Sequence, residues 1–205
     1  MKDTSIRYES KKVKIIAVSK TFSLDQILPL IQYGHIDFGE NKVQEAVEKW
    51  SETKKKNPSI KLHMIGKLQT NKVKYVVPLF DYIHSLDNIK LAKKISEEQK
   101  KYKKRLKIFI QINIGEEDQK SGIAIDELKN FYNICVNDFS LNIVGIMCLP
   151  PIKSKNDFYF LKMQELIKNL PVHELSMGMS NDYINAYNSG ATFLRIGSKI
   201  FGERS

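Results

Sequence analysis

The sequence predicts an α/β fold, and more specifically a single (β/α)8 barrel of the TIM type. Eight short β-rich runs recur along the 205 residues, and segments with helical spacing separate them. Strands that alternate with helices form parallel βαβ units, and eight such units are enough to close a barrel. The eight runs are residues 14–19, 35–39, 61–66, 81–85, 107–114, 142–147, 173–178 and 192–197.

The segments between these runs show the period of an amphipathic helix. Apolar residues recur at Leu24, Ile27, Leu28 and Ile31 in the first segment, and at Phe158, Leu161, Met163, Leu166 and Ile167 in the sixth. This spacing predicts helices that cover the strands with one apolar side.

A doubly wound open sheet is the alternative arrangement of the same elements. Such sheets often carry a GxGxxG or GxxxxGK[ST] nucleotide motif, and the sequence has neither. The barrel is therefore preferred. No Pro-, Gly- or Ser-rich linker divides the chain, so we expect one domain over residues 1–205. Its first strand is expected to begin near residue 14, after a short extension of residues 1–13.

The basic charge balance does not favour a nucleic-acid partner. There are 33 Lys and Arg against 23 Asp and Glu, a net charge of +10. Only Arg7, Arg105, Arg195 and Arg204 are arginines, and the lysines are spread over the predicted helices. Base readout and bidentate phosphate contacts favour arginine, so we expect solvated lysine-rich helix faces.

Other classes of protein are also excluded by composition. No stretch approaches 18 apolar residues, and the N-terminus lacks the apolar core of a secretory signal. We therefore expect a cytoplasmic protein without a membrane partner. The two cysteines and four histidines lack the spacing of metal ligands, so no metal site is expected.

Strand parity places polar side chains inside the predicted barrel. On the first strand Lys20 shares a face with Ile16 and Val18, and on the last strand Arg195 shares a face with Phe193. Barrel interiors usually carry Val, Ile and Leu, and ligands bind at the carboxyl ends of the strands. Because the last strand closes against the first, Lys20 and Arg195 are predicted to be neighbours in a polar pocket.

The loops after the last two strands predict an anion site. Gly178 and Ser180 precede one predicted helix, and Gly197 and Ser198 precede another. Glycine lets the backbone approach an anion, serine adds a hydroxyl donor, and a helix N-terminus offers unpaired N–H groups. An amine nucleophile, an anion cradle and an arginine suit a phosphorylated aldehyde such as pyridoxal 5'-phosphate (PLP).

Each candidate site residue, including His63, Met179 and Lys120, also has a simpler interpretation. Lys20 could be a solvated lysine at a strand end, and Arg195 a structural ion-pair partner. His63 could either line the pocket or be a satisfied core histidine. Met179 could serve packing alone, and Lys120 could be either an ordinary surface lysine or a group that binds or relays an anionic ligand.

Seven motifs, in order and spacing, resemble the YggS/PROSC family of PLP homeostasis proteins. They are AVSK (17–20), FGENKVQE (38–45), HMIGKLQTNK (63–72), KSGI (120–123), GIM (145–147), SMGMSND (176–182) and RIGSKIFGER (195–204). The resemblance implies a barrel like the N-terminal domain of bacterial alanine racemase, that is, a fold type III PLP-binding domain.

The resemblance also implies a role for individual residues. Lys20 would be the Schiff-base lysine, and Arg195 would face the pyridine nitrogen of PLP. The phosphate would be held by Ser180, Gly197 and Ser198. Candidate pocket-lining residues are Asn41, His63, Met147 and Met179, and Lys120 is the candidate relay.

The function expected from the resemblance is intracellular PLP (vitamin B6) homeostasis. The protein would hold PLP as a Schiff base and pass it on, with apo PLP-dependent enzymes as candidate recipients and without catalytic turnover. We expect a monomer. The alternatives are a PLP-dependent amino-acid racemase or weak transaminase, an unrelated phosphate-binding barrel enzyme, and a basic RNA-binding module. Racemases of this type use a tyrosine from an additional domain, for which we expect no room in 205 residues.

Overall fold

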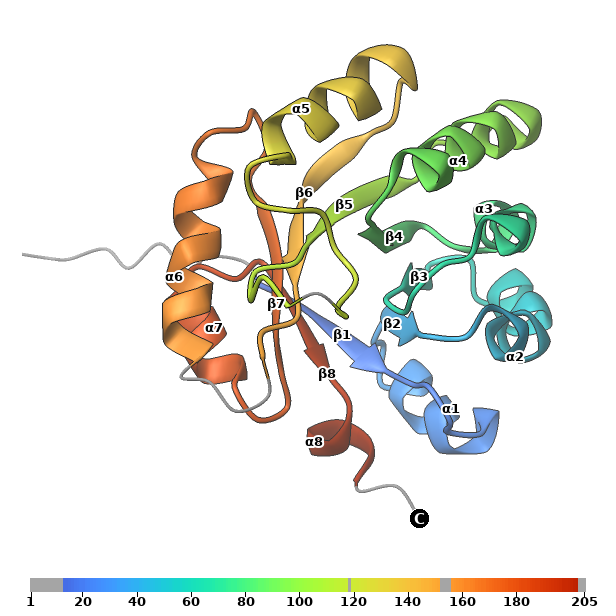
Figure 1. Cartoon of the computed structure of the whole chain (residues 1–205). Coiled ribbons are helices and arrows are strands. Elements are labelled where there is room, and N and C mark those ends of the chain that lie inside the picture. Colours follow the sequence, from blue (N-terminus) through green and yellow to red (C-terminus); the bar gives the residue numbers. More distant parts are fainter. Residues whose placement is uncertain (1–12, 118, 152–155, 203–205) are drawn as a thin grey trace, which may run out of the picture.

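The computed structural model describes residues 13–117, 119–151 and 156–202, and these form a closed barrel of eight parallel strands (Figure 1). Each strand pairs with the next one in the sequence, and the last pairs with the first. The strands are β1 Lys14–Val18, β2 Asp37–Glu40, β3 Lys61–Met64, β4 Tyr82–Leu86, β5 Lys107–Ile112, β6 Ile143–Cys148, β7 Glu174–Met179 and β8 Phe193–Ile196. The predicted barrel is confirmed, and the open sheet is excluded.

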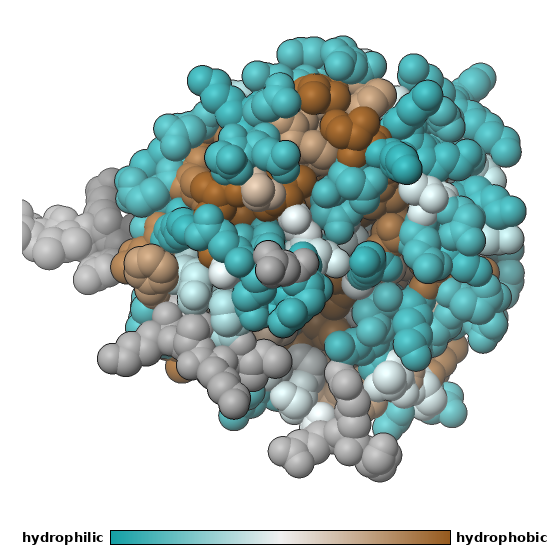
Figure 2. All heavy atoms as spheres, in the orientation of Figure 1, coloured by the Kyte–Doolittle hydropathy of each residue, from teal (hydrophilic) through white to brown (hydrophobic). Residues whose placement is uncertain are grey.

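Helices lie around the outside of the strands in Figure 1. They are α1 Leu24–Gln32, α2 Val43–Lys56, α3 Val73–Leu79, α4 Ile89–Tyr102, α5 Leu128–Asn133, α6 Asn156–Ile167, α7 Tyr183–Asn188 and α8 Ser198–Phe201. Hydrophilic side chains cover most of the face seen in Figure 2. Among the described residues, no helix is both long enough and apolar enough to cross a membrane.

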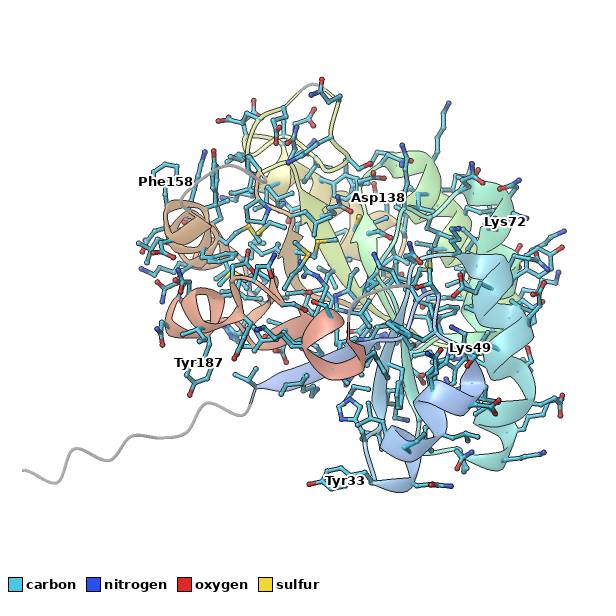
Figure 3. The ribbon with its side chains drawn as sticks, turned by 90° about the horizontal axis from the view of Figure 1, so that it is seen from below. Tyr33, Lys49, Lys72, Asp138, Phe158 and Tyr187 are labelled. Carbon is cyan, nitrogen blue, oxygen red and sulfur yellow. The ribbon has the colours of Figure 1, made fainter. Side chains whose placement is uncertain are left out.

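The buried face of α6 differs from the face that the sequence pattern predicted. Phe160, Met163 and Ile167 are the buried residues, at the i, i+3 and i+7 positions of one helix face. Phe158 and Leu161, which the pattern assigned to the apolar side, are 65% and 53% exposed. Figure 3 shows Phe158 pointing away from the barrel. Apolar spacing alone could not separate these two faces because both carry large apolar residues.

The strands separate two hydrophobic layers. The outer layer lies between strands and helices and includes Ala17 and Trp50. The lumen holds a second cluster, made of Ile16, Tyr82, Phe109, Met147 and Phe193. The alternation of Ile16 and Ala17 between these layers confirms the parity on which the pocket prediction rested.

The two phenylalanines of α6 test the observed orientation of this helix. Phe160→Ala removes a side chain with no exposed surface and should lower the free energy of unfolding by about 3–5 kcal/mol. Phe158→Ala on the same helix should change it by less than about 0.5 kcal/mol. Urea denaturation followed by Trp50 fluorescence measures both values. Equal losses would contradict the orientation.

Candidate functional site

A cavity of about 570 Å³ opens at the carboxyl ends of the strands. Its wall comes from the loops after β1, β2, β3, β6, β7 and β8, on the face where barrel enzymes bind their ligands. The lining residues are Val18, Lys20, Phe22, Asn41, Ile65, Gly66, Leu149, Pro150, Met179, Ser180, Asn181, Asp182, Arg195, Gly197, Ser198 and Gly202. This volume suits a small ligand.

Most residues predicted from the sequence meet in this cavity. Those that line it are Lys20, Asn41, Met179, Ser180, Arg195, Gly197 and Ser198. His63 and Met147 also point inward, but they are buried in the lumen earlier along β3 and β6 and are not among the described lining residues. Lys120 is not among them either, and its Nζ lies 2.5 Å from a carboxylate oxygen of Glu117 in the same loop.

The residues on both sides of Lys20 are anchored to β2 and α2. The Ser19 hydroxyl donates to Glu40 Oε1 at 2.7 Å, and Lys49 Nζ donates to the Ser19 carbonyl at 2.9 Å. The Thr21 N–H donates to Glu45 Oε1 at 2.6 Å. Thr21 has a φ of +69°, a conformation that is rare for a β-branched residue and needs such support. Lys20 therefore projects from a fixed loop.

Glu40 is the centre of this anchor. Its carboxylate is fully buried, and Oε1 also accepts hydrogen bonds from Lys49 Nζ at 3.0 Å and from Trp50 Nε1 at 2.9 Å. Lys49, labelled on α2 in Figure 3, also pairs with Glu45 at 3.2 Å. A buried carboxylate is tolerated only when it is paired and hydrogen-bonded in this way.

Arg195 lies on β8 and is almost completely buried, with 4% of the residue exposed. One terminal nitrogen donates to the Ser176 hydroxyl at 2.7 Å, and the other donates to the Cys148 carbonyl at 2.9 Å. Burial lowers the pKa of Arg195 from its usual value, but the side chain stays charged because arginine is so strongly basic. Its five N–H donors leave some for a group in the cavity.

The thiol of Cys148 contributes no charge to this region. Burial raises the pKa of Cys148 to about 12, so the side chain is a neutral thiol at physiological pH. Arg195 is therefore the cation on this side of the cavity, held by neutral partners.

The loops after β7 and β8 are tied together at the other side of the cavity. The Gly197 N–H donates to the Ser180 hydroxyl at 3.2 Å, and Asp182 accepts from the Met179 N–H at 2.6 Å. Gly178 makes the turn possible, since its φ is +89° and a Cβ there would lie 2.5 Å from the Cβ of Ala186. The two serine hydroxyls and the first backbone N–H groups of α8 form a neutral, donor-rich wall suited to an anion.

Two further features of the cavity are consistent with a bound ligand. Asn41 Oδ1 is buried without a hydrogen-bond partner among the described residues, although it belongs to a lining residue. A Cβ on Gly197 would project beside Val18 at 3.5 Å, so glycine keeps this part of the cavity open. The donor set and the volume fit a small phosphorylated ring with an amine-reactive group.

Several functional residues were missed at the level of sequence. Phe22, Gly66 and Asp182 line the cavity, and Glu40 and Lys49 support Lys20. Gly66 and Asp182 stand within the quoted motifs and next to strand ends, which was a usable signal. The pairing of Glu40 with Lys49 connects the outer face of β2 to α2, and no spacing in the sequence predicts it.

Comparison with known proteins gives a consistent result. The family model described as the N-terminal domain of alanine racemase matches residues 4–205. Relatives named pyridoxal phosphate homeostasis protein include one from Pasteurella multocida, 39% identical over 94% of this chain and 87% of the relative. Another, from Aquifex aeolicus, is 36% identical over 93% of this chain and 87% of the relative.

Solved structures show the same barrel. The structure of PipY from Synechococcus elongatus with PLP bound has a TM-score of 0.85 and 31% identity, covering 93% of each chain. An alanine racemase from Clostridium difficile has a TM-score of 0.71 at 14% identity. The match covers 95% of this chain and 53% of that racemase, and it supports the fold alone.

Glu40→Gln tests the anchor beneath Lys20. The amide still accepts hydrogen bonds, but among the described residues it leaves Lys49, whose side chain is 9% exposed, with Glu45 alone as a counter-charge. The free energy of unfolding should fall by roughly 3 kcal/mol, at the lower end of the cost of breaking a buried ion pair. Guanidinium denaturation followed by circular dichroism measures the loss.

Glu48→Gln is the matched control, because Glu48 is exposed on α2, the helix that carries Lys49, and its carboxylate accepts from Gln44. It should change stability by less than about 0.5 kcal/mol. A Glu40→Gln protein as stable as this control would show that the buried charge does not anchor the loop.

Proposed function

Because the chain belongs to the family of pyridoxal phosphate homeostasis proteins, built on the alanine racemase N-terminal domain, we propose that it binds PLP in the cavity and holds it covalently on Lys20. The observation that carries the proposal is the convergence of Lys20, Arg195 and the two serine-bearing loops on one cavity. These are a nucleophilic amine, a fixed cation and an anion-binding wall.

Each of these groups would meet a different part of the cofactor. Ser180, Ser198 and the backbone at Gly197 would hold the phosphate, and Arg195 would donate to the pyridine nitrogen. Lys20 would bind the aldehyde carbon. When bound, PLP supplies an aldehyde that reacts reversibly with amines.

The same residues favour a carrier over a catalyst. Arginine cannot take a proton from a ring nitrogen or lend it one, so Arg195 would keep that nitrogen unprotonated and limit the ring as an electron sink. In the described part of the chain, the ionisable residues on the cavity wall are Lys20, Asp182 and Arg195. Asp182 already accepts the Met179 N–H, and this contact ties it to the β7 turn.

We propose that the protein passes PLP on to apo-enzymes that require it, in the cytoplasm and as a monomer. Cys135 and Cys148 are both free and buried, as in proteins of a reducing compartment. One chain supplies the lysine, the arginine and the hydroxyls, so the site needs no second copy of the chain.

The covalent bond to Lys20 is the first thing to test. The purified protein mixed with PLP should be yellow, because the bond to the lysine nitrogen extends the conjugation of the pyridine ring. Lys20→Ala should lose the visible band. Lys67→Ala should keep it, since Lys67 is exposed beside Gly66 but is not among the described lining residues. Borohydride reduction and peptide mass mapping should find the pyridoxyl group on Lys20; its presence only on other lysines would refute the assignment.

A second experiment separates the carrier from a racemase or transaminase. The PLP-loaded protein should restore activity to an apo-enzyme, because release needs only the reversal of imine formation. Exchange of the α-proton of alanine, followed by NMR in deuterated water, should stay near the rate with free PLP. Rapid exchange that is lost in Lys20→Ala would show a catalyst instead.

A further inference from the structure

A continuous series of hydrogen bonds crosses the barrel lumen beneath the cavity. It begins at Arg195, which donates to the Ser176 hydroxyl at 2.7 Å. His84 Nδ1 lies 2.9 Å from that hydroxyl, and His84 Nε2 lies 3.0 Å from His63 Nδ1. His63 Nε2 lies 2.9 Å from Asp37 Oδ1. The five side chains come from β8, β7, β4, β3 and β2.

The interior of this series is dry. His63, His84 and Ser176 have no exposed surface. The His63 ring stacks on Tyr82 with centroids 4.2 Å apart, and the His84 ring stacks on Phe109 at 4.3 Å. Asp37, at the first residue of β2, is 15% exposed in its side chain. The series therefore joins the cavity to the opposite, amino-terminal end of the barrel.

The two ends determine which atom donates in every bond. The Asp37 carboxylate can only accept, so a neutral His63 donates to it from Nε2 and accepts on Nδ1. A neutral His84 then donates to His63 from Nε2, which leaves its own Nδ1 as an acceptor. The Ser176 hydroxyl therefore gives its proton to His84 Nδ1 and accepts from Arg195, which can only donate. All four bonds point the same way, from the cation to the anion.

The surrounding charges are consistent with two neutral rings. Burial, together with the neighbouring His63 and Arg195, holds the pKa of His84 well below its usual value. Burial also lowers the pKa of His63, although Asp37 opposes this shift. Asp81, directly before β4, raises the pKa of His63, and Lys14 on β1 lowers it. Among the described residues, no group of His, Cys, Asp and Glu is arranged to hold a metal ion.

We propose that Ser176, His84, His63 and Asp37 are positioning residues that orient the Arg195 guanidinium toward the cofactor, with the Asp37 carboxylate as the final acceptor at the far end of the barrel. This inference rests on the proposed PLP site. The direct partners of Arg195, Ser176 and Cys148, are both neutral. Polarised hydrogen bonds in a low-dielectric interior strengthen one another, so removing a middle member should loosen the arginine.

The first test needs no cofactor. In the ¹⁵N NMR spectrum of the wild-type protein, His63 and His84 should both be neutral and protonated on Nε2. Arg195→Met should shift the ring nitrogen signals of His63, which does not contact the arginine. In a protein that already carries Ser176→Ala, adding Arg195→Met should cause no further shift of the His63 signals. His173, which is exposed, is the internal control.

Either of two results would overturn the series. A charged ring, or a neutral ring protonated on Nδ1, at His63 or His84 of the wild-type protein would contradict the proposed direction of the hydrogen bonds. This measurement uses the wild-type protein alone, so it does not depend on whether the variants fold. A His63 signal that is indifferent to Arg195→Met in the wild-type background would show that the arginine is not coupled to it.

The second test measures PLP affinity by the visible band. Asp37→Asn should weaken binding by about 2-fold to 30-fold, the usual range for mutations that couple to a distant site. Glu174→Gln is the control, because Glu174 is the first residue of β7, at the same end of the barrel, and takes no part in the series. Equal affinity in both variants would refute the positioning role. Failure of the wild-type protein to bind PLP would instead refute the proposed function, and the histidine signals would still test the series.

Discussion

The pairing of β1 with β8 is the constraint on which the rest of the structure depends. In this register Ile16 lies opposite Arg195 and Ala17 opposite Ile196. Lys20 follows a few residues later, above the level of the arginine and at the same mouth. The two ends of the barrel sequence thus supply the two cationic side chains of one cavity. Closure also encloses the lumen, so that an arginine on β8 can be held by groups from β7, β4, β3 and β2.

A polar lumen is costly unless every group in it has a partner. Barrel interiors are usually filled with branched aliphatic residues, and an unpaired polar group there costs about 1–3 kcal/mol. In this barrel Ile16, Tyr82, Phe109, Met147 and Phe193 pack the apolar part. Five polar side chains, from Asp37 to Arg195, run through them as one connected series in which each neighbouring pair shares a hydrogen bond. Such an interior stabilises the barrel less than an aliphatic one would, but it fixes the orientation of its arginine.

The sequence predicted what depends on period and order, and it missed what depends on contacts between strands. All eight strands fell where β-rich runs predicted them, and parity correctly sent Ile16 and Phe193 into the lumen. His84 and Ser176 carried no recognisable spacing, because their partners lie on strands far apart in the chain. The pairing of Glu40 with Lys49 was missed for a different reason, since it joins a strand to the outer helix that follows it and no single period relates the two.

One short strand connects the two supports of the site. In β2, Asp37 and Gly39 face the lumen, where Asp37 ends the series that leads to Arg195. Phe38 and Glu40 face α2, where Glu40 anchors the loop that carries Lys20. Among the described contacts, the lumen series and the Glu40 cluster share no side chain. If PLP is held as proposed, its covalent bond and its ring contact therefore rest on independent networks that meet only in the backbone of β2. Weakening the hold on the ring would then leave the lysine loop in place, so release would depend on breaking the bond to Lys20.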